Sequence, residues 1–302
     1  MKPGTKVTYE TQTRSHIKPN IGSVKLHALT PHAVQGFINA LETVDGSGRK
    51  LSPKTVKNVH GVLHKALEQA KDIGYIYQNP ATGTKLPRSV RSDIKPLEYE
   101  TVASFLEAIK GHRFERLYMV ALFTGLRSSE VLGLTWDCVD FEKGTIYVYR
   151  QLQRNKGIYS FLSLKNERPR LITPAADVIK ALRDQRKQQA EWHLRAGEAW
   201  QRRGNTDFIF TDELGNHLAD QTVYKHFKRI MKVLGFPQTR LHDLRHTYAV
   251  MSLQAGDSVK TVQEHMGHHT AAFTLDMYGH VTEKMRTESA QRMQAYIDNI
   301  RK

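Results

Sequence analysis

Two histidines and an arginine stand in the stretch LHDLRHTYAV, residues 241–250, which otherwise has the apolar spacing of an amphipathic helix. In a helix, His242 and Arg245 are three residues apart and share a face, with Leu244 and Tyr248 in the apolar stripe opposite. This spacing leaves two interpretations open: a solvated polar face, or a reaction site built from a base and a guanidinium.

Three other stretches also place polar groups at the edge of an apolar segment. TGLRSSE contains Arg127, LSLKNERPR contains Lys165, and HMGHHTAAFTLDMYGH contains His268 and Tyr278. Taken alone, each has a simple structural interpretation. Arg127 would form an ion pair with Glu130, and Lys165 would be a solvated lysine of a hairpin.

The order of these residues is more informative than any one of them. An arginine, a hairpin lysine, His-x-x-Arg, Gly-His and a tyrosine ten residues later together resemble the catalytic domain of the tyrosine recombinase (phage integrase) family. The segments HIKPNIGSVKLHALTPHAVQGFI and LSPKTVKNVHGVLHKALEQA resemble the core-binding domain of integrases from phages and conjugative transposons. The resemblance covers nearly the whole chain. It implies a site-specific recombinase that integrates or excises a mobile element.

Phosphoryl transfer explains why such residues would be combined. Attack on a DNA phosphodiester builds negative charge on the non-bridging oxygens, and planar guanidinium groups match that geometry with paired hydrogen bonds. Arg127 and Arg245 are therefore the expected phosphate clamp. A tyrosine with a pKa of about 10 needs help to lose its proton, and His242 is the first candidate base. Glu130, one turn beyond Arg127, is expected to orient the clamp or the neighbouring histidine.

The remaining roles are implied by the resemblance. Lys165 would protonate the leaving 5′ oxygen, and His268 would hydrogen-bond the phosphate. Attack by Tyr278 would leave a 3′-phosphotyrosine and a free 5′ hydroxyl, which conserves the bond energy for rejoining without ATP, metal or any other cofactor. Of the competing tyrosines, Tyr248 is expected in the core, and Tyr224 has no Gly-His nearby.

Other functional classes are less consistent with the sequence. A type IB topoisomerase-like enzyme would share the tyrosine chemistry but would not exchange strands between partners. A noncatalytic DNA-binding regulator would not need the complete catalytic set. The chain shows no carboxylate cluster of the kind that holds two metal ions in nucleases. His265, His268 and His269 lack a matching cysteine or carboxylate ligand, so we predict no metal site.

Composition points to a nucleic-acid partner. Forty-five lysines and arginines against thirty acidic residues give a net charge of +15, which favours a polyanion such as double-stranded DNA. With 302 residues, 39% of them hydrophobic, the chain is predicted to form about two folded domains. It has no apolar run near the ~18 residues of a membrane span, and no basic and apolar leader. Its single cysteine, Cys138, rules out an internal disulfide, so we predict a cytoplasmic protein.

The first part of the chain is predicted to be a helical DNA-binding domain. In LSPKTVKNVHGVLHKALEQA, Ser52 would cap a helix and Pro53 would occupy its first position. The polar face of this helix either follows a phosphate backbone or is merely solvated. Its basic residues are Lys54, Lys57, His60, His64 and Lys65. Three prolines and several turn residues then favour a linker at residues 87–96, between a core-binding domain at 1–86 and a catalytic domain at 97–302.

The second part is predicted to hold the catalytic residues on helices and a small antiparallel sheet, which makes the fold class α+β and mainly helical. Two helices would meet at Gly125, TIYVYRQL, IYSFLSL and PRLITP would be strands, and DFIFTDELGNHL would be a strand and turn.

The tail TEKMRTESAQRMQAYIDNIRK has helical spacing at Met285, Met293, Tyr296 and Ile297. It is expected to dock on a neighbour in a tetramer assembled on paired sites, or on its own domain. Many family members also have an arm-binding domain ahead of the core-binding domain, and some act with an accessory directionality factor. Because this sequence begins too late for an arm-binding domain, we expect a truncated chain or a short family member.

Overall fold

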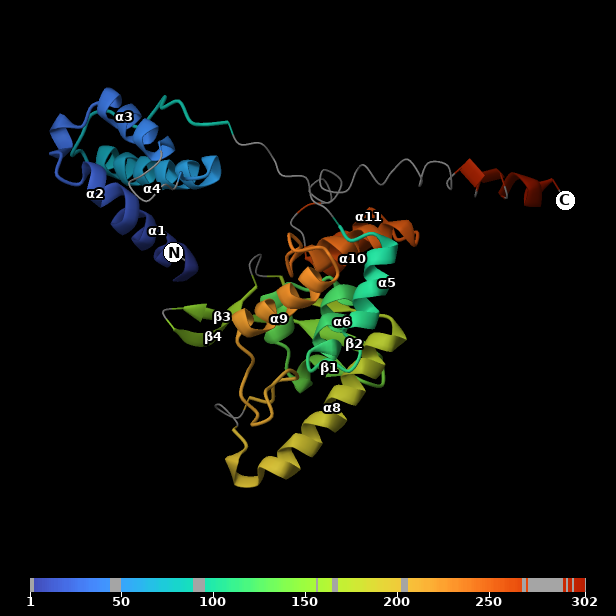
Figure 1. Cartoon of the computed structure of the whole chain (residues 1–302). Helices are drawn as coiled ribbons and strands as arrows, with labels where there is room; N and C mark the ends of the chain where they lie inside the picture. Colours follow the sequence, from blue (N-terminus) through green and yellow to red (C-terminus); the bar gives the residue numbers. More distant parts are fainter. Residues whose placement is uncertain are drawn as a thin grey trace. The chain divides into compact units, whose positions relative to one another are not determined.

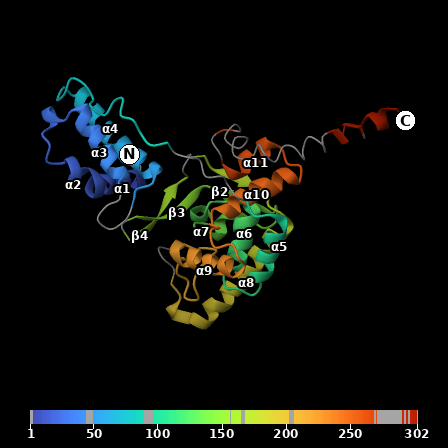
Figure 2. The same cartoon turned by 45° about the horizontal axis from the view of Figure 1, so that its top comes forward.

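The computed structural model describes residues 3–43, 50–88, 96–155, 157–164, 168–201, 206–267, 270, 290–291, 293–294 and 296–301. Contacts divide the chain into two compact units, Met1–Asp93 and Ile94–Lys302. Figures 1 and 2 show the first as a helical unit and the second as helices packed with short strands, with the β3–β4 hairpin at its edge. The expected α+β, mainly helical fold class is confirmed. Among the described helices, none is both long enough and apolar enough to cross a bilayer.

The first unit contains only helices in its described residues. They are α1 (Pro3–Gln12), the π turn η1 (Thr13–Ile17), α2 (Lys18–Ile21), the 3₁₀ turn η2 (Leu26–Ala28), α3 (Pro31–Glu42) and α4 (Pro53–Asp72). Ser52 accepts a hydrogen bond from the Thr55 N–H and Pro53 begins α4, as the sequence predicts. The core is formed where α3 packs on α4, with Phe37, Ile38 and Val59 among its buried residues.

The second unit begins with three helices and a short turn. These are α5 (Tyr99–Ala108), α6 (Glu115–Thr124), α7 (Ser128–Leu132) and η3 (Trp136–Cys138). The later helices are α8 (Ala176–Ala196) with the turn η4 (Gly197–Ala199), α9 (Asp220–Val233), α10 (Asp243–Gln254) and α11 (Val259–Met266). Phe105, Tyr118 and Phe227 join α5, α6 and α9 in an aromatic core, and the Tyr118 hydroxyl donates to the Val223 carbonyl at 2.9 Å.

The predicted segments form antiparallel strands, but TIYVYRQL is divided between two strands, and the expected single sheet is two sheets. One has the order β1 (Val139–Asp140), β2 (Thr145–Val148) and β5 (Arg170–Ile172), with Ile146 opposite Ile172. The other is the hairpin of β3 (Arg150–Asn155) and β4 (Ile158–Ser163). β5 contacts α11, and β3 contacts α7. These contacts bring both sheets to the elements that carry the candidate site.

The strand predicted in DFIFTDELGNHL is wrong for the described residues. Phe208 makes only an isolated bridge with Thr135, and Thr211 makes one with His217. The apolar run is buried, and glutamine side chains of α8 occupy the place of a neighbouring strand. Gln189 donates to the Phe208 carbonyl at 2.8 Å, and Gln185 donates to the Ile209 carbonyl at 3.2 Å. The backbone carbonyls are therefore satisfied without a ladder.

Candidate active site

The turn between α6 and α7 is built around Gly125. This residue caps α6 in the left-handed region, at a φ of 62°. A Cβ atom at this position would lie 2.3 Å from Cδ1 of Tyr248 in α10, which is too close for any side chain. Glycine thus allows the turn to pass against α10. The close approach places the turn at Gly125 against α10. The predicted meeting of two helices at Gly125 is confirmed, because α6 ends at Thr124 and α7 begins at Ser128.

Arg127 immediately precedes α7 and is tied to Glu130 in two ways. The Glu130 carboxylate accepts the Arg127 backbone N–H at 3.0 Å and the Arg127 Nη1 group at 2.8 Å. The Arg127 side chain is 21% exposed and the Glu130 side chain only 1%. The predicted Arg127–Glu130 ion pair is therefore present. Glu130 anchors the guanidinium through its Nη1 group, and the Arg127 side chain remains partly exposed.

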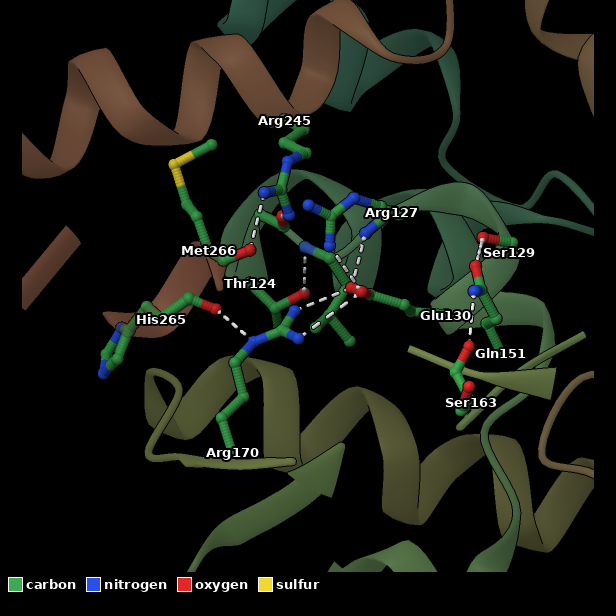
Figure 3. Close-up of polar contacts among 12 residues, drawn as sticks. Thr124, Arg127, Ser129, Glu130, Gln151, Ser163, Arg170, Arg245, His265 and Met266 are labelled. Carbon is green, nitrogen blue, oxygen red and sulfur yellow. Dashed lines mark hydrogen bonds and ion pairs between the residues drawn. The ribbon is translucent and has the colours of Figure 1, made fainter. Parts of the chain in front are cut away.

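Glu130 also has a partner that the sequence interpretation missed, Arg170 at the start of β5. The Nη2 group of Arg170 donates to Glu130 Oε2 at 2.6 Å, and its Nη1 group donates to Oε1 at 3.4 Å. Burial alone would raise the pKa of Glu130, but the charges and hydrogen bonds of Arg170 and then Arg127 outweigh burial and hold the pKa at about 2. Figure 3 shows the Glu130 carboxylate between the two guanidinium groups. It is ionised throughout the physiological range.

Arg245 lies on the first turn of α10 and is 3% exposed. Its Nη1 group donates to the Gly125 carbonyl at 2.5 Å, and its Nη2 group donates to the Met266 carbonyl at 2.6 Å. The first bond ties Arg245 to the chain two residues before Arg127. The second ties it to the last residue of α11 (Figure 3). Both predicted clamp arginines therefore belong to one site.

His242 is the residue before α10 and remains accessible to solvent. Surrounding protein atoms partly desolvate its ring and lower the pKa of His242, and the positive charges of Arg245 and Arg127 lower it further against the opposing effect of Asp243. His242 also lines a small pocket with Ser128 and Arg245. A neutral imidazole is the form that can accept a proton, so His242 is suited to act as a base beside the two arginines.

His246 is buried behind His242 and faces its ring edge-on, with 4.9 Å between the ring centroids. Burial, followed by the nearby charge of His242, lowers the pKa of His246 to about 4. The sequence interpretation noted this second histidine of the stretch but gave it no role. Its position one turn beyond His242 was the available signal, but a second histidine in a helix does not show by itself that it is buried.

A further pair joins α10 to α11. The Tyr248 hydroxyl lies 2.8 Å from Nδ1 of His265, and the Tyr248 ring packs on the core shared by the two helices. The predicted core position of Tyr248 is consistent with this packing. His265 is engaged here through its ring and with Arg170 through its backbone carbonyl. Groups of three or more residues suited to hold a metal ion are absent from the described part of the chain.

Lys165, His268 and Tyr278 lie outside the described residues, as does Met285 of the predicted C-terminal helix. Of the predicted tail positions that are described, Met293 and Tyr296 are exposed and Ile297 is partly buried; Ile300 is also exposed. In the first unit, Lys54, Lys57 and Lys65 of α4 are exposed, while His60 and His64 are half-buried. Nε2 of His60 lies 3.1 Å from the Ala81 carbonyl, and its ring is tilted against that of His64. The exposed charge of this predicted DNA-binding face therefore comes from its three lysines.

Comparison with known proteins agrees with the geometry of the site. Residues 93–285 match the Phage integrase family, and residues 1–42 match the phage integrase N-terminal SAM-like domain. The Tyrosine recombinase XerC-like protein of Caldanaerobacter subterraneus subsp. tengcongensis is 31% identical over 97% of this chain and 78% of its own length. The ICEBs1 integrase of Bacillus subtilis is 26% identical over 80% of this chain and 66% of its own length.

The fold is likewise similar to solved integrases. The Tn1549 transposon integrase in complex with transposon right end DNA has a TM-score of 0.81 and 25% identity, over 97% of this chain and 95% of that one. A lambda integrase dimer bound to a core site has a TM-score of 0.64 at 17% identity, over 90% of each chain, which is a likeness of fold. The chain belongs to the phage integrase family of tyrosine recombinases. Its activity is site-specific DNA recombination, and the comparisons do not favour the topoisomerase or regulator alternatives.

Proposed function

We propose that this recombinase cleaves and rejoins DNA of a mobile element through a 3′-phosphotyrosyl intermediate, with Tyr278 as the nucleophile and without metal or ATP. The observation that carries the proposal is that two distant stretches of sequence bring Arg127, His242 and Arg245 together. His242 and Arg245 line one small pocket with Ser128, the residue after Arg127, and the charges of both arginines act on the His242 ring. Two guanidinium groups and a neutral imidazole are the groups that in-line attack on a phosphodiester requires.

In this mechanism, Arg127 binds a non-bridging oxygen of the scissile phosphate with the part of its guanidinium that Glu130 does not occupy. Arg245 contributes a buried positive charge, and its hydrogen bonds to the Gly125 and Met266 carbonyls hold the backbone at these two residues. His242 accepts the proton of the Tyr278 hydroxyl as the bond to phosphorus forms. The roles of Lys165, as the acid for the leaving 5′ oxygen, and of His268, as a further phosphate ligand, come from the sequence resemblance.

The remaining parts of the proposal concern DNA and assembly. The net charge of +15 and the exposed lysines of α4 support binding of double-stranded DNA, which is the ligand of the structurally similar Tn1549 integrase. We assign the core-binding role to residues 1–86, the linker to 87–96 and catalysis to 97–302. The exposed apolar side chains of Met293, Tyr296 and Ile300 are consistent with a tail that docks on a neighbour in a tetramer. An accessory directionality factor and a cytoplasmic location remain predictions from the sequence.

The test is formation of a covalent protein–DNA adduct on a nicked suicide substrate that carries an end of the element. We expect an adduct from the unmodified protein in the presence of EDTA, and its loss in Tyr278→Phe. Tyr224→Phe is the matched control, because Tyr224 is an exposed tyrosine of α9 outside the site. Peptide mapping then locates the modified residue. An adduct on a different tyrosine, or cleavage that needs a metal and leaves no adduct, would reject the proposal.

A further inference from the structure

Arg170 has an unusual position for an arginine at the start of a strand. It lies on β5, opposite Val148 of β2, and its side chain is only 9% exposed. A buried guanidinium is costly unless its charge is paired and its N–H groups have acceptors. Arg170 meets both conditions through two different elements. Its terminal nitrogens bind the Glu130 carboxylate of α7, and its Nε group donates to the His265 carbonyl of α11 at 2.6 Å.

The end of α11 is built to receive this side chain. The last carbonyls of a helix lack partners within the helix, and cations near them are favourable. Here the carbonyls of His265 and Met266 accept hydrogen bonds from Arg170 and Arg245 respectively. Gly267 then ends α11 in the left-handed region at a φ of 63°, and a Cβ there would lie 3.0 Å from Nη1 of Arg170. A glycine at this position leaves room for the guanidinium against the turn.

Glu130 connects the two ends of this network. Its carboxylate holds the Arg127 guanidinium on one side and the Arg170 guanidinium on the other. If Arg170 were lost, the buried carboxylate would lose the charge that contributes most to keeping it ionised. A protonated Glu130 would have less capacity to accept hydrogen bonds from Arg127. Arg170 therefore acts on Arg127 indirectly, by fixing both the position and the charge of Glu130.

We propose that Arg170 is a positioning residue of the cleavage site. It holds Arg127, which binds the phosphate, and the end of α11 in a fixed arrangement relative to each other. The inference rests on the proposed function, in which the segment after α11 supplies His268 and Tyr278. The Arg170 guanidinium binds both Glu130 of α7 and the His265 carbonyl of α11. It therefore fixes, before DNA binds, the distance between Arg127, which binds the phosphate, and the end of α11, after which the segment with Tyr278 begins. Such pre-organisation matters because small displacements of reacting groups slow the chemical step strongly.

The decisive variant is Arg170→Lys, which keeps the charge and most of the stem but removes the planar fork. An ammonium is a point donor and does not reproduce two bonds to Glu130 together with a third to the His265 carbonyl. The matched control is Arg150→Lys. Arg150 is a partly buried strand arginine that donates to Thr135 and pairs with Asp137, with no bond to Glu130 or α11.

Four quantities are measured on each protein: the single-turnover cleavage rate at saturating protein, the dissociation constant for the DNA site, the melting temperature and the pH profile of cleavage. We expect Arg170→Lys to bind DNA within about two-fold of the unmodified protein and to melt close to Arg150→Lys, yet to cleave about 10- to 100-fold more slowly. Arg150→Lys is expected to cleave at nearly the unmodified rate.

The pH profile separates positioning from a general loss of structure. In Arg170→Met, the pKa of Glu130 rises, so the acid limb of the cleavage rate is expected to move to higher pH. Adding Glu130→Gln to Arg170→Met removes the titrating group, and this shift is expected to disappear. A merely structural role of Arg170 would leave the limb in place in both proteins. The lysine variant retains the test if the methionine variant does not fold.

The outcomes separate the inference from the proposed function. If the unmodified protein forms no phosphotyrosine adduct, both are rejected. If it forms the adduct and Arg170→Lys cleaves as fast as Arg150→Lys, the proposed function stands and the positioning role of Arg170 is overturned. An unmoved acid limb in Arg170→Met would also overturn it. The inference is supported by slower cleavage at unchanged DNA affinity, together with a shift of the acid limb in Arg170→Met that disappears when Glu130→Gln is added.

Discussion

Replacing Gly125 with alanine tests how closely the α6–α7 turn is packed against α10. The substitution has two costs. A residue with a Cβ at a φ of 62° pays about 1–2 kcal/mol for the left-handed conformation. The new methyl group would also lie 2.3 Å from the Tyr248 ring, and forcing a group into a packed interior costs a further 1–3 kcal/mol or so. The expected loss of unfolding free energy is therefore about 2–5 kcal/mol.

Gly111→Ala is a matched control for the first cost alone. Gly111 has a φ of 71°, and a Cβ there would have no atom within 4 Å. Urea denaturation of both variants should show Gly125→Ala less stable than Gly111→Ala by about 1–3 kcal/mol. Because the Gly125 carbonyl accepts a hydrogen bond from Arg245, Gly125→Ala should also slow DNA cleavage, whereas Gly111→Ala should not.

A second substitution assigns the difference to Tyr248. In a Tyr248→Leu background the ring is absent, so Gly125→Ala should cost little more than Gly111→Ala does. Equal stability losses for the two alanine variants in the unmodified background would refute this account, because the close approach of the turn to Tyr248 would then have no energetic consequence. A Gly125→Ala protein with normal stability and normal cleavage would also refute the role of the turn in holding Arg245.

Three further results are expected. Arg245→Ala should lower the free energy of unfolding, measured in urea, by several kcal/mol, because it leaves two backbone carbonyls without their donor at about 1–3 kcal/mol each. Arg127→Ala should lower the free energy of unfolding less, because the Arg127 side chain is 21% exposed, but it should still abolish cleavage. The ionised Glu130 should contribute about 3 kcal/mol to the free energy of unfolding above pH 4.5, because its pKa falls from 4.5 to about 2 on folding. This contribution is lost as the pH falls toward 2. The stability of Glu130→Gln should therefore depend less on pH in acid than that of the unmodified protein. Lys57→Ala should reduce the slope of the logarithm of DNA affinity against the logarithm of salt concentration by about one, and an unchanged slope would remove Lys57 from the DNA interface.

The parts of the fold that were predictable from the sequence have local causes. Ser52 and Pro53 mark the start of α4 because a capping hydroxyl and a fixed φ act within one turn. The Arg127–Glu130 pair follows from a spacing of three residues. The run around Phe208 was misassigned because a short apolar run has the same pattern in a buried strand and in a buried irregular segment. Only the placement of Gln185 and Gln189 beneath it decides between the two.

Arg170 could not be found in this way because its partners are distant in sequence. Glu130 lies 40 residues before it, and His265 lies 95 residues after it. The local pattern is also ambiguous. In the strand RLI, Leu171 and Ile172 are both apolar, so alternation alone does not show which face is buried. The structure buries Ile172 and leaves Leu171 61% exposed, and Arg170 shares the face of Ile172. An inward arginine followed by an outward leucine is the reverse of what hydrophobicity predicts.

The two clamp arginines look alike in the sequence but have different surroundings. The Arg127 side chain is partly exposed, and within the described residues its guanidinium binds Glu130 through Nη1. Arg245 is buried and uses both terminal nitrogens on backbone carbonyls from separate elements. Arg245 therefore brings a buried positive charge to the site while it fixes the backbone at Gly125 and Met266. In a site with two such arginines, the exposed one is suited to follow the phosphate oxygens as the geometry at phosphorus changes. The charge of the buried arginine, Arg245, is already in place before the reaction begins. It can therefore stabilise the charge that develops at the phosphate without any reorganisation of the site.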